Sequence, residues 1–204
     1  MNKVMKKRET KRKEILNKTY HLIQLKGYHA TGIKELADEA GMPKGSFFNY
    51  FQNKEDYILA AIELYTIGAV QQSSQILNNQ NINPIERIKK FYQSRIDQTQ
   101  EQIEKKMSCL LNILSQEVGV GSSDLGKLLE ASLDKIKKPL EDCLQEAKVL
   151  NQILPNADPI QLAEFLENSW RGALIIAKAR NNLQPIFAFK HILETIFITQ
   201  GEQK

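Results

Sequence analysis

The chain has 204 residues, of which 42% are hydrophobic and 25% are charged, and its net charge at neutral pH is +4. These fractions match soluble globular proteins and exclude a disordered or collagen-like chain. Residues 1–54 have a net charge of +7 and the remaining residues a net charge of −3. This uneven distribution predicts a polyanionic partner for the N-terminal end only.

The sequence shows no secretion signal and no membrane span. The basic start, residues 1–13, is not followed by the apolar stretch that a secretion signal requires. The longest uncharged stretch, residues 64–85, is rich in Gln, Asn and Ser and cannot span a bilayer. Two cysteines, Cys109 and Cys143, do not form a disulfide framework. We therefore expect a cytoplasmic protein with free thiols and no membrane partner.

Apolar residues recur at helical spacing between the few glycines and prolines, and the sequence predicts an all-α fold with about nine helices. Thr31 and Asn53 are the predicted N-caps of the second and fourth helices. The expected helices cover about residues 10–26, 32–40, 44–50, 54–76, 85–104, 107–118, 123–150, 159–181 and 186–200.

Two short helices joined by Gly41-Met42-Pro43, after a basic leader, are typical of a helix-turn-helix. The second helix of this motif enters the major groove and needs polar, hydrogen-bonding side chains. Phe47 and Phe51 are expected to anchor it to the first two helices. Lys54 begins the fourth helix, where backbone amides and the helix dipole favour a phosphate. The groove-facing candidates are Lys44, Gly45, Ser46, Asn49 and Tyr50.

Residues 31–55, TGIKELADEAGMPKGSFFNYFQNKE, resemble the N-terminal signature of TetR-type (TetR/AcrR family) transcriptional regulators. With the preceding helix, which ends in Lys26-Gly27-Tyr28, the resemblance covers about residues 9–65. It implies a basic flexible arm (1–8), a DNA-binding domain (9–65, with the helix-turn-helix at about 32–51) and a ligand-binding and dimerisation domain (66–204).

The resemblance also implies individual roles. Thr31 matches the family's phosphate-contacting cap and Lys54 its phosphate clamp. Pro43 stands where the family commonly has Ser or Thr, so the hydroxyl of that cap is missing. The implied DNA-contacting set is Thr31, Lys44, Gly45, Ser46, Phe48, Asn49, Tyr50 and Lys54.

Residues 160–177 and 187–197 place apolar side chains on more than one helix face, too many for a single buried stripe. The resemblance implies that these two helices pair with those of a second subunit as a four-helix bundle. A homodimer suits a palindromic double-stranded DNA operator, because two recognition helices must lie about 34–36 Å apart.

The segment 107–117, MSCLLNILSQE, is similar to a TetR subgroup whose C-L-L…Q-E helix lines the effector cavity. Some members of that subgroup respond to electrophiles or oxidants through the cysteine, and a nearby lysine would favour the reactive thiolate of Cys109. The candidate ligand-binding or sensing residues are Tyr65, Met107, Cys109, Asn112, Trp170 and Lys178.

Each candidate has a structural alternative. A cysteine on an apolar helix face is commonly a small buried hydrophobe, and this is the interpretation preferred for both Cys109 and Cys143. Trp170 suits a packed interface, and Tyr65 suits a helical core, as do Phe91 and Tyr92. Lys137-Lys138 is most simply a solvated face.

Enzyme and metal motifs are absent from the sequence. It has no P-loop, GxGxxG, GxSxG, HExxH or CxxC pattern, and its three histidines lack metal-ligand spacing. We predict no catalytic residue, metal or cofactor. The predicted function is a sequence-specific transcriptional repressor released from its operator by a small-molecule effector. The alternatives are an activator of the same fold, a non-specific DNA-coating protein and a membrane-surface protein that uses its basic arm.

Overall fold

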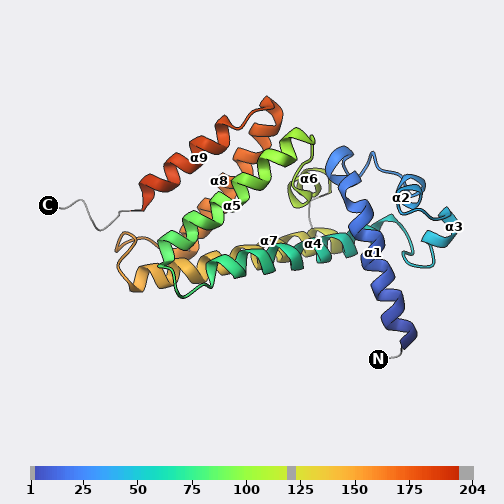
Figure 1. Ribbon diagram of the computed structural model, residues 1–204, viewed down its shortest axis with the longest axis horizontal. Helices are drawn as coiled ribbons and strands as arrows, with labels where there is room; N and C mark the ends of the chain where they lie inside the picture. Colours follow the sequence, from blue (N-terminus) through green and yellow to red (C-terminus); the bar gives the residue numbers. More distant parts are fainter. Residues whose placement is uncertain (1–2, 119–122, 198–204) are drawn as a thin grey trace. The chain divides into compact units, whose positions relative to one another are not determined.

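The computed structural model describes residues 3–118 and 123–197, which form nine helices and no strand (Figure 1). The all-α prediction is confirmed. No helix in these residues is long and apolar enough to cross a membrane. The predicted break at residues 119–122 and the predicted helix end at residue 200 lie outside the described residues. The helices are α1 (Lys3–Lys26), α2 (Ile33–Glu39), α3 (Lys44–Phe47), α4 (Lys54–Leu77), α5 (Pro84–Glu104), α6 (Leu110–Glu117), α7 (Asp124–Val149), α8 (Pro159–Arg180) and α9 (Gln184–Ile196).

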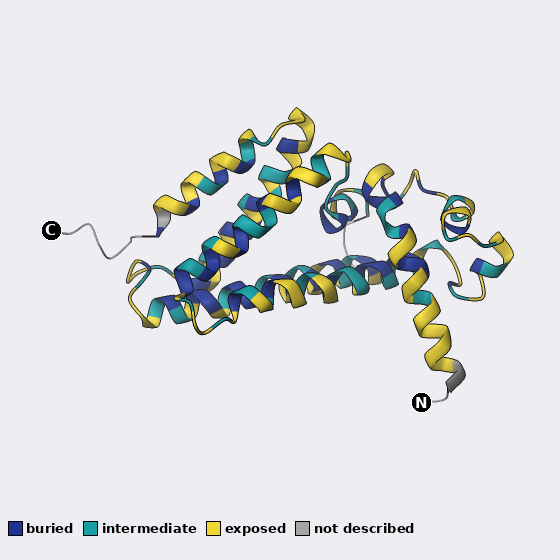
Figure 2. Cartoon of the chain, in the orientation of Figure 1, coloured by how far each residue is buried: buried dark blue, intermediate teal, exposed yellow. Residues whose placement is uncertain are grey.

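The chain divides into two compact units. The first combines residues 1–67 with residues 107–133 and therefore holds α1 to α3, α6 and parts of α4 and α7. Figure 2 shows that α1 is mostly exposed over residues 5–14 and is buried along one face from Ile15 onward. Side chains from five helices meet in the core of this unit: Ile15, Leu16, Ile23, Leu36, Phe47, Phe51, Tyr57, Ile58, Ile62, Leu110 and Leu111.

The second unit combines residues 68–106 with residues 134–204, and α5, α8 and α9 pack together within it. Trp170 lies at its centre, with its ring centroid 5.8 Å from that of Tyr92 and 5.4 Å from that of Phe189. Phe91 and Tyr92 are core residues, as predicted. Cys143 is also buried, and burial raises the pKa of its thiol to about 11. This confirms that Cys143 is structural.

Several helix ends follow from local chemistry. Gly27 after α1 and Asn181 after α8 both have the left-handed backbone that commonly ends a helix, with φ of 91° and 50°. The side chain of Asn53 accepts a hydrogen bond from the backbone N–H of Asp56 at 2.7 Å. Asn53 is therefore the N-cap of α4, as predicted.

The predicted cap of α2 is wrong. Gly32 is the N-cap residue, without a side-chain hydrogen bond. Thr31 is 1% exposed and its hydroxyl donates to the carbonyl of Gly27 at 2.7 Å. The hydroxyl thus closes the turn that follows α1 instead of capping the next helix.

Three other boundaries differ from the expected ones. α1 already begins at Lys3, within the predicted arm, because Lys, Arg, Glu and Met are good helix formers. α3 ends at Phe47, and the next residues continue in tighter turns. α6 begins three residues later than expected because Ser108 exchanges two hydrogen bonds with Gln24 of α1. The N–H of Ser108 donates to the Gln24 carbonyl (2.9 Å), and Nε2 of Gln24 donates to the Ser108 carbonyl (3.1 Å).

Candidate DNA-binding and effector sites

An aromatic cluster holds α3 in place. The ring centroids of Phe47 and Phe51 lie 5.0 Å apart, and that of Tyr57 on α4 lies 5.2 Å from Phe51. The Tyr57 hydroxyl is 2.8 Å from that of Thr19 on α1. Burial raises the pKa of Tyr57, so the hydroxyl stays neutral and hydrogen-bonded. This cluster, formed by Phe47, Phe51 and Tyr57, fixes the short α3 against α1 and α4.

The opposite face of α3, together with the turn of residues 48–50 that follows it, is open. Lys44, Gly45, Phe48 and Asn49 are exposed, and Ser46 is half-buried, as is Tyr50. A Cβ built at Gly45 would meet no atom within 4 Å, so packing within the chain does not require glycine there. Pro43 caps α3 without a side-chain hydrogen bond. The face therefore offers an ammonium, an amide and an aromatic ring, groups that can contact base edges and phosphates.

The two predicted phosphate contacts differ in exposure. The side chain of Thr31 is buried, which does not favour a direct contact with DNA. Lys54 is half-buried at the start of α4, with Nζ 4.3 Å from the centroid of the Tyr28 ring. Burial lowers the pKa of Lys54, and the nearby charge of Glu117 acts in the opposite direction.

Four of the predicted effector-sensing residues lie in the first unit. Cys109 is half-buried and is the N-cap residue of α6, with Sγ 3.4 Å from the hydroxyl of Tyr65 on α4. Met107 precedes it and is half-buried, and Asn112 is buried on α6. The structure thus brings Cys109 and Tyr65 together.

The other two predicted sensing residues lie on α8 in the second unit. Trp170 is 1% exposed and packed between rings, which favours the structural alternative for this residue. Lys178 is exposed near the end of the same helix.

The family model described as bacterial regulatory proteins, tetR family, matches residues 15–61. The model described as tetracyclin repressor-like, C-terminal domain, matches residues 84–193. The chain belongs to the TetR family.

Individual TetR-family relatives match over most of their length. The chain is 33% identical to the transcriptional regulator YxaF of Bacillus subtilis, over 97% of this chain and all of that one. It is 28% identical to the transcriptional regulator AcuR of Cereibacter sphaeroides, over 90% and 83% of the two chains. The crystal structure of the reduced form of Escherichia coli NemR superposes with a TM-score of 0.83 at 26% identity, over 94% and 99% of the chains. NemR is named a transcriptional repressor.

Arg12 on α1 was not predicted from the sequence as a functional residue. Its side chain stabilises the segment that follows α3. Its Nη1 donates to the carbonyl of Tyr50 at 2.8 Å, and its Nη2 pairs with Asp56 at 3.1 Å. The guanidinium also lies 4.7 Å from the centroid of Phe51. Arg12 lies one helical turn before the buried Ile15 and thus on the same face of α1, which is the feature of the sequence that could have indicated its contact with the core. Sequence reasoning also missed Glu117, whose contacts are described below.

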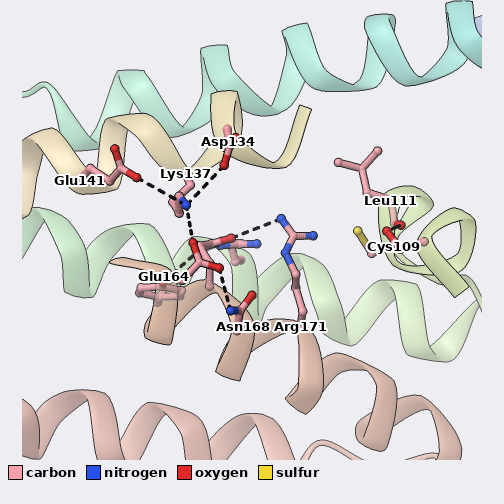
Figure 3. A network of polar contacts seen from close by, with 12 residues as sticks. Cys109, Leu111, Asp134, Lys137, Glu141, Glu164, Asn168 and Arg171 are labelled. Atoms are coloured by element: carbon pink, nitrogen blue, oxygen red, sulfur yellow. Dashed lines mark hydrogen bonds and ion pairs between the residues drawn. The ribbon is translucent and has the colours of Figure 1, made fainter. Parts of the chain in front are cut away.

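One prediction about the TetR-type C-terminal region is wrong. Lys137 was assigned to a solvated face, but its side chain is 15% exposed and pairs with Asp134 (3.4 Å), Glu141 (3.6 Å) and Glu164 (Figure 3). Lys138 is 62% exposed, as expected for a solvated lysine. Three carboxylates therefore converge on one lysine and join α7 to α8.

A buried carboxylate lies deeper in the same TetR-type unit. Glu167 is 3% exposed and accepts hydrogen bonds from the hydroxyl of Tyr92 (3.1 Å) and from Nη1 of Arg95 (2.5 Å). Arg171 lies 3.5 Å from its other oxygen. Burial alone would raise the pKa of Glu167, but the two guanidiniums outweigh it and hold the pKa below its ordinary value.

Proposed function

We propose that the protein is a transcriptional repressor that binds operator DNA through the exposed face of α3 and leaves it when an effector binds. One observation carries the proposal: an open face with Lys44, Phe48 and Asn49, backed by the buried aromatic cluster, in a chain that belongs to the TetR family. The name of NemR, a repressor similar over most of both chains, supports repression over activation.

Release from the operator requires a differential affinity. The dimer sets two α3 segments at the half-site spacing of about 34–36 Å. An effector dissociates the complex only if it binds the DNA-incompetent state more tightly than the competent one.

The experiment is a footprint on the DNA upstream of the protein's own gene, followed by titration of the protected operator and of a random duplex. A repressor binds the operator at least about 10³-fold more tightly. A smaller ratio would favour the non-specific DNA-coating alternative.

The apolar outer surface of α8 and α9 supports a homodimer. It has a groove of about 310 Å³ that is lined by Phe165, Ala173, Phe189 and Ile192 among others. Large apolar patches of this kind mark interaction surfaces. The exposed apolar side chains of the two helices are Ile160, Phe165, Ile175, Ile176, Phe187 and Ile192.

Introducing a charged side chain at this apolar surface tests whether it is the dimer interface. Phe165→Glu is expected to give monomers in sedimentation and to lose operator binding. Phe48→Glu, at an exposed phenylalanine of the first unit, is the matched control and should stay dimeric while losing DNA. A Phe165→Glu variant that stays dimeric would place the interface elsewhere.

For the effector, we propose an electrophile that reacts with Cys109. This thiol is half-buried at the start of α6, beside the hydroxyl of Tyr65. An activated alkene adds to it without a leaving group: sulfur bonds one alkene carbon and the thiol proton ends on the neighbouring carbon. The adduct enlarges the side chain at a position packed between α4 and α6.

N-ethylmaleimide is a suitable probe. It should release wild-type protein from the operator and leave Cys109→Ser bound, whereas Cys143→Ser should behave like wild type. If Cys109→Ser is also released, Cys109 is a core residue and the effector is recognised by other groups.

A further inference from the structure

The loop between α1 and α2 is built around a carboxylate from a distant helix. Glu117, the last residue of α6, accepts the backbone N–H of Tyr28 at 2.6 Å and that of His29 at 3.1 Å, both at Oε2. Its own backbone carbonyl lies 3.3 Å from Nε2 of His29. Bonds to an ionised acceptor are stronger than neutral ones, so Glu117 ties α6 to this loop.

The residue before Tyr28 leaves room for that carboxylate. Gly27 has φ of 91°, a conformation that side chains rarely adopt. A Cβ at this position would also lie 2.0 Å from Oε1 of Glu117. The backbone conformation therefore favours glycine here, and a side chain at this position would also displace the Glu117 carboxylate.

The ring of Tyr28 carries the next contact. Nζ of Lys54 lies 4.3 Å from its centroid, within the range of a cation–π interaction. Tyr28 thus connects two groups: its backbone N–H binds Glu117, and its ring supports the ammonium of Lys54. All of these residues belong to the first compact unit.

We infer that Glu117 is a positioning residue for DNA binding: it holds the Tyr28 ring as the platform that presents Lys54 to a DNA phosphate. The inference rests on the proposed function, in which Lys54 contacts the DNA backbone. Glu117 itself, as an anion, does not contact DNA. Its effect on affinity passes through Lys54.

A double-mutant cycle separates this role from a purely structural one. Binding to a random DNA duplex is measured between 50 and 200 mM salt for wild type, Glu117→Ala, Lys54→Ala and the double variant. A random duplex is sufficient because phosphate contacts are independent of sequence. Glu117→Ala should weaken binding roughly 2- to 150-fold, the range of coupling between contacting residues, and should flatten the salt slope by up to about one unit. In the Lys54→Ala background, Glu117→Ala should change nothing further.

Three further variants distinguish the positioning role of Glu117 from a general loss of folded structure. Glu117→Gln keeps an acceptor for both amides and should bind DNA within about threefold of wild type, the effect of about one lost weak interaction. Tyr28→Leu keeps the backbone N–H but removes the ring, and should reproduce both the affinity and the salt slope of Glu117→Ala. Glu130→Ala, at an exposed carboxylate of α7 in the same unit, should bind as wild type does.

The results that overturn the inference are distinct from those that overturn the function. If Glu117→Ala binds DNA as wild type does, or weakens binding equally with and without Lys54, Glu117 does not act through Lys54. If wild type shows no preference for its operator, the proposed repressor function fails, whatever the cycle shows.

Discussion

The two units of the molecule place their charges differently. In the first, Arg12 and Asp56 form an ion pair in which each side chain remains more than a quarter exposed, and the buried side chains that the structure describes are aromatic, aliphatic or uncharged polar groups. In the second, Glu167 and Arg87 are almost fully buried, and each has a partner of opposite charge. A unit that binds a polyanion from outside keeps its cations at the surface. The second unit uses buried charge within its own structure.

The difference matters because buried and exposed pairs contribute differently to stability. An exposed pair typically contributes less than about 1 kcal/mol. Breaking a buried pair leaves an uncompensated charge in a medium that solvates it poorly, which is far more costly. Substitutions in the second unit should therefore act mainly on stability, and those on the open face of α3 mainly on DNA binding.

The largest effect is expected for Glu167→Ala. Its removal leaves Arg95 and Arg171 without their shared carboxylate and the hydroxyl of Tyr92 without its acceptor. The free energy of unfolding in urea should fall by about 3–5 kcal/mol. Glu101→Ala is the control: Glu101 lies on α5, as Arg95 does, and forms an exposed pair with Lys105 at the end of that helix, so its loss should leave the unfolding midpoint unchanged. Equal losses in both variants would remove the contrast between buried and exposed ion pairs.

Asn49→Ala should affect the choice of DNA sequence. The amide is exposed in the turn that directly follows α3 and suits a bidentate contact with a base edge, so its loss should reduce discrimination by about 1–3 kcal/mol at one position of each half-site. Selection of bound sequences from a random library measures this preference, with unfolding in urea as the stability control. An unchanged preference would exclude Asn49 from base recognition.

Lys54→Ala should weaken binding to every sequence and reduce the slope of log affinity against log salt by about one unit per protomer, because one phosphate contact is lost. Lys18→Ala, at an exposed lysine on α1, serves as the matched comparison for general charge. If both variants reduce the salt slope equally, the effect of Lys54 is one of general charge and not of a specific phosphate contact.

The smallest effect is a change with pH. The pKa of Glu167 is lowered in the folded state, so its charge stabilises the fold above its ordinary value of 4.5 and that stability is lost as the pH falls through the folded value. The difference in unfolding free energy between wild type and Glu167→Gln should therefore be largest near neutral pH and shrink below about pH 4.5. A difference that stays constant down to pH 3 would contradict the ionised state of Glu167.

The sequence predicted the first unit more completely than the second, for physical reasons. Helical spacing and the register of glycines and aromatics indicated the helix-turn-helix, the Asn53 cap and the anchoring role of Phe47 and Phe51. Spacing shows which face of a helix is buried but not which partner covers it. The prediction for Lys137 failed because its partner Glu164 lies on another helix.

Two residues of the first unit were missed for the same reason: their contacts are with residues that are distant in the sequence. Arg12 has the same charge as its neighbours Lys11 and Lys13, and its contacts with Tyr50, Phe51 and Asp56, which are distant in the sequence, distinguish it. The hydrogen bond between Glu117 and Tyr28 joins residues 89 positions apart, a pairing that no local pattern reveals. The predicted division into functional domains at residue 65 stays a prediction, while contacts group residues 107–133 with the first unit.

The two cysteines give the protein an internal measure of its own folding. Cys143 is buried in the core, and this burial raises the pKa of its thiol to about 11, whereas Cys109 is half-buried. A short exposure to a thiol reagent should therefore add one label to a folded chain and two to an unfolded one. Counting labels by mass then reports the folded fraction of a sample, without an added dye or tag. The same count tells whether an electrophile released the repressor from DNA by a specific reaction or by destroying its structure.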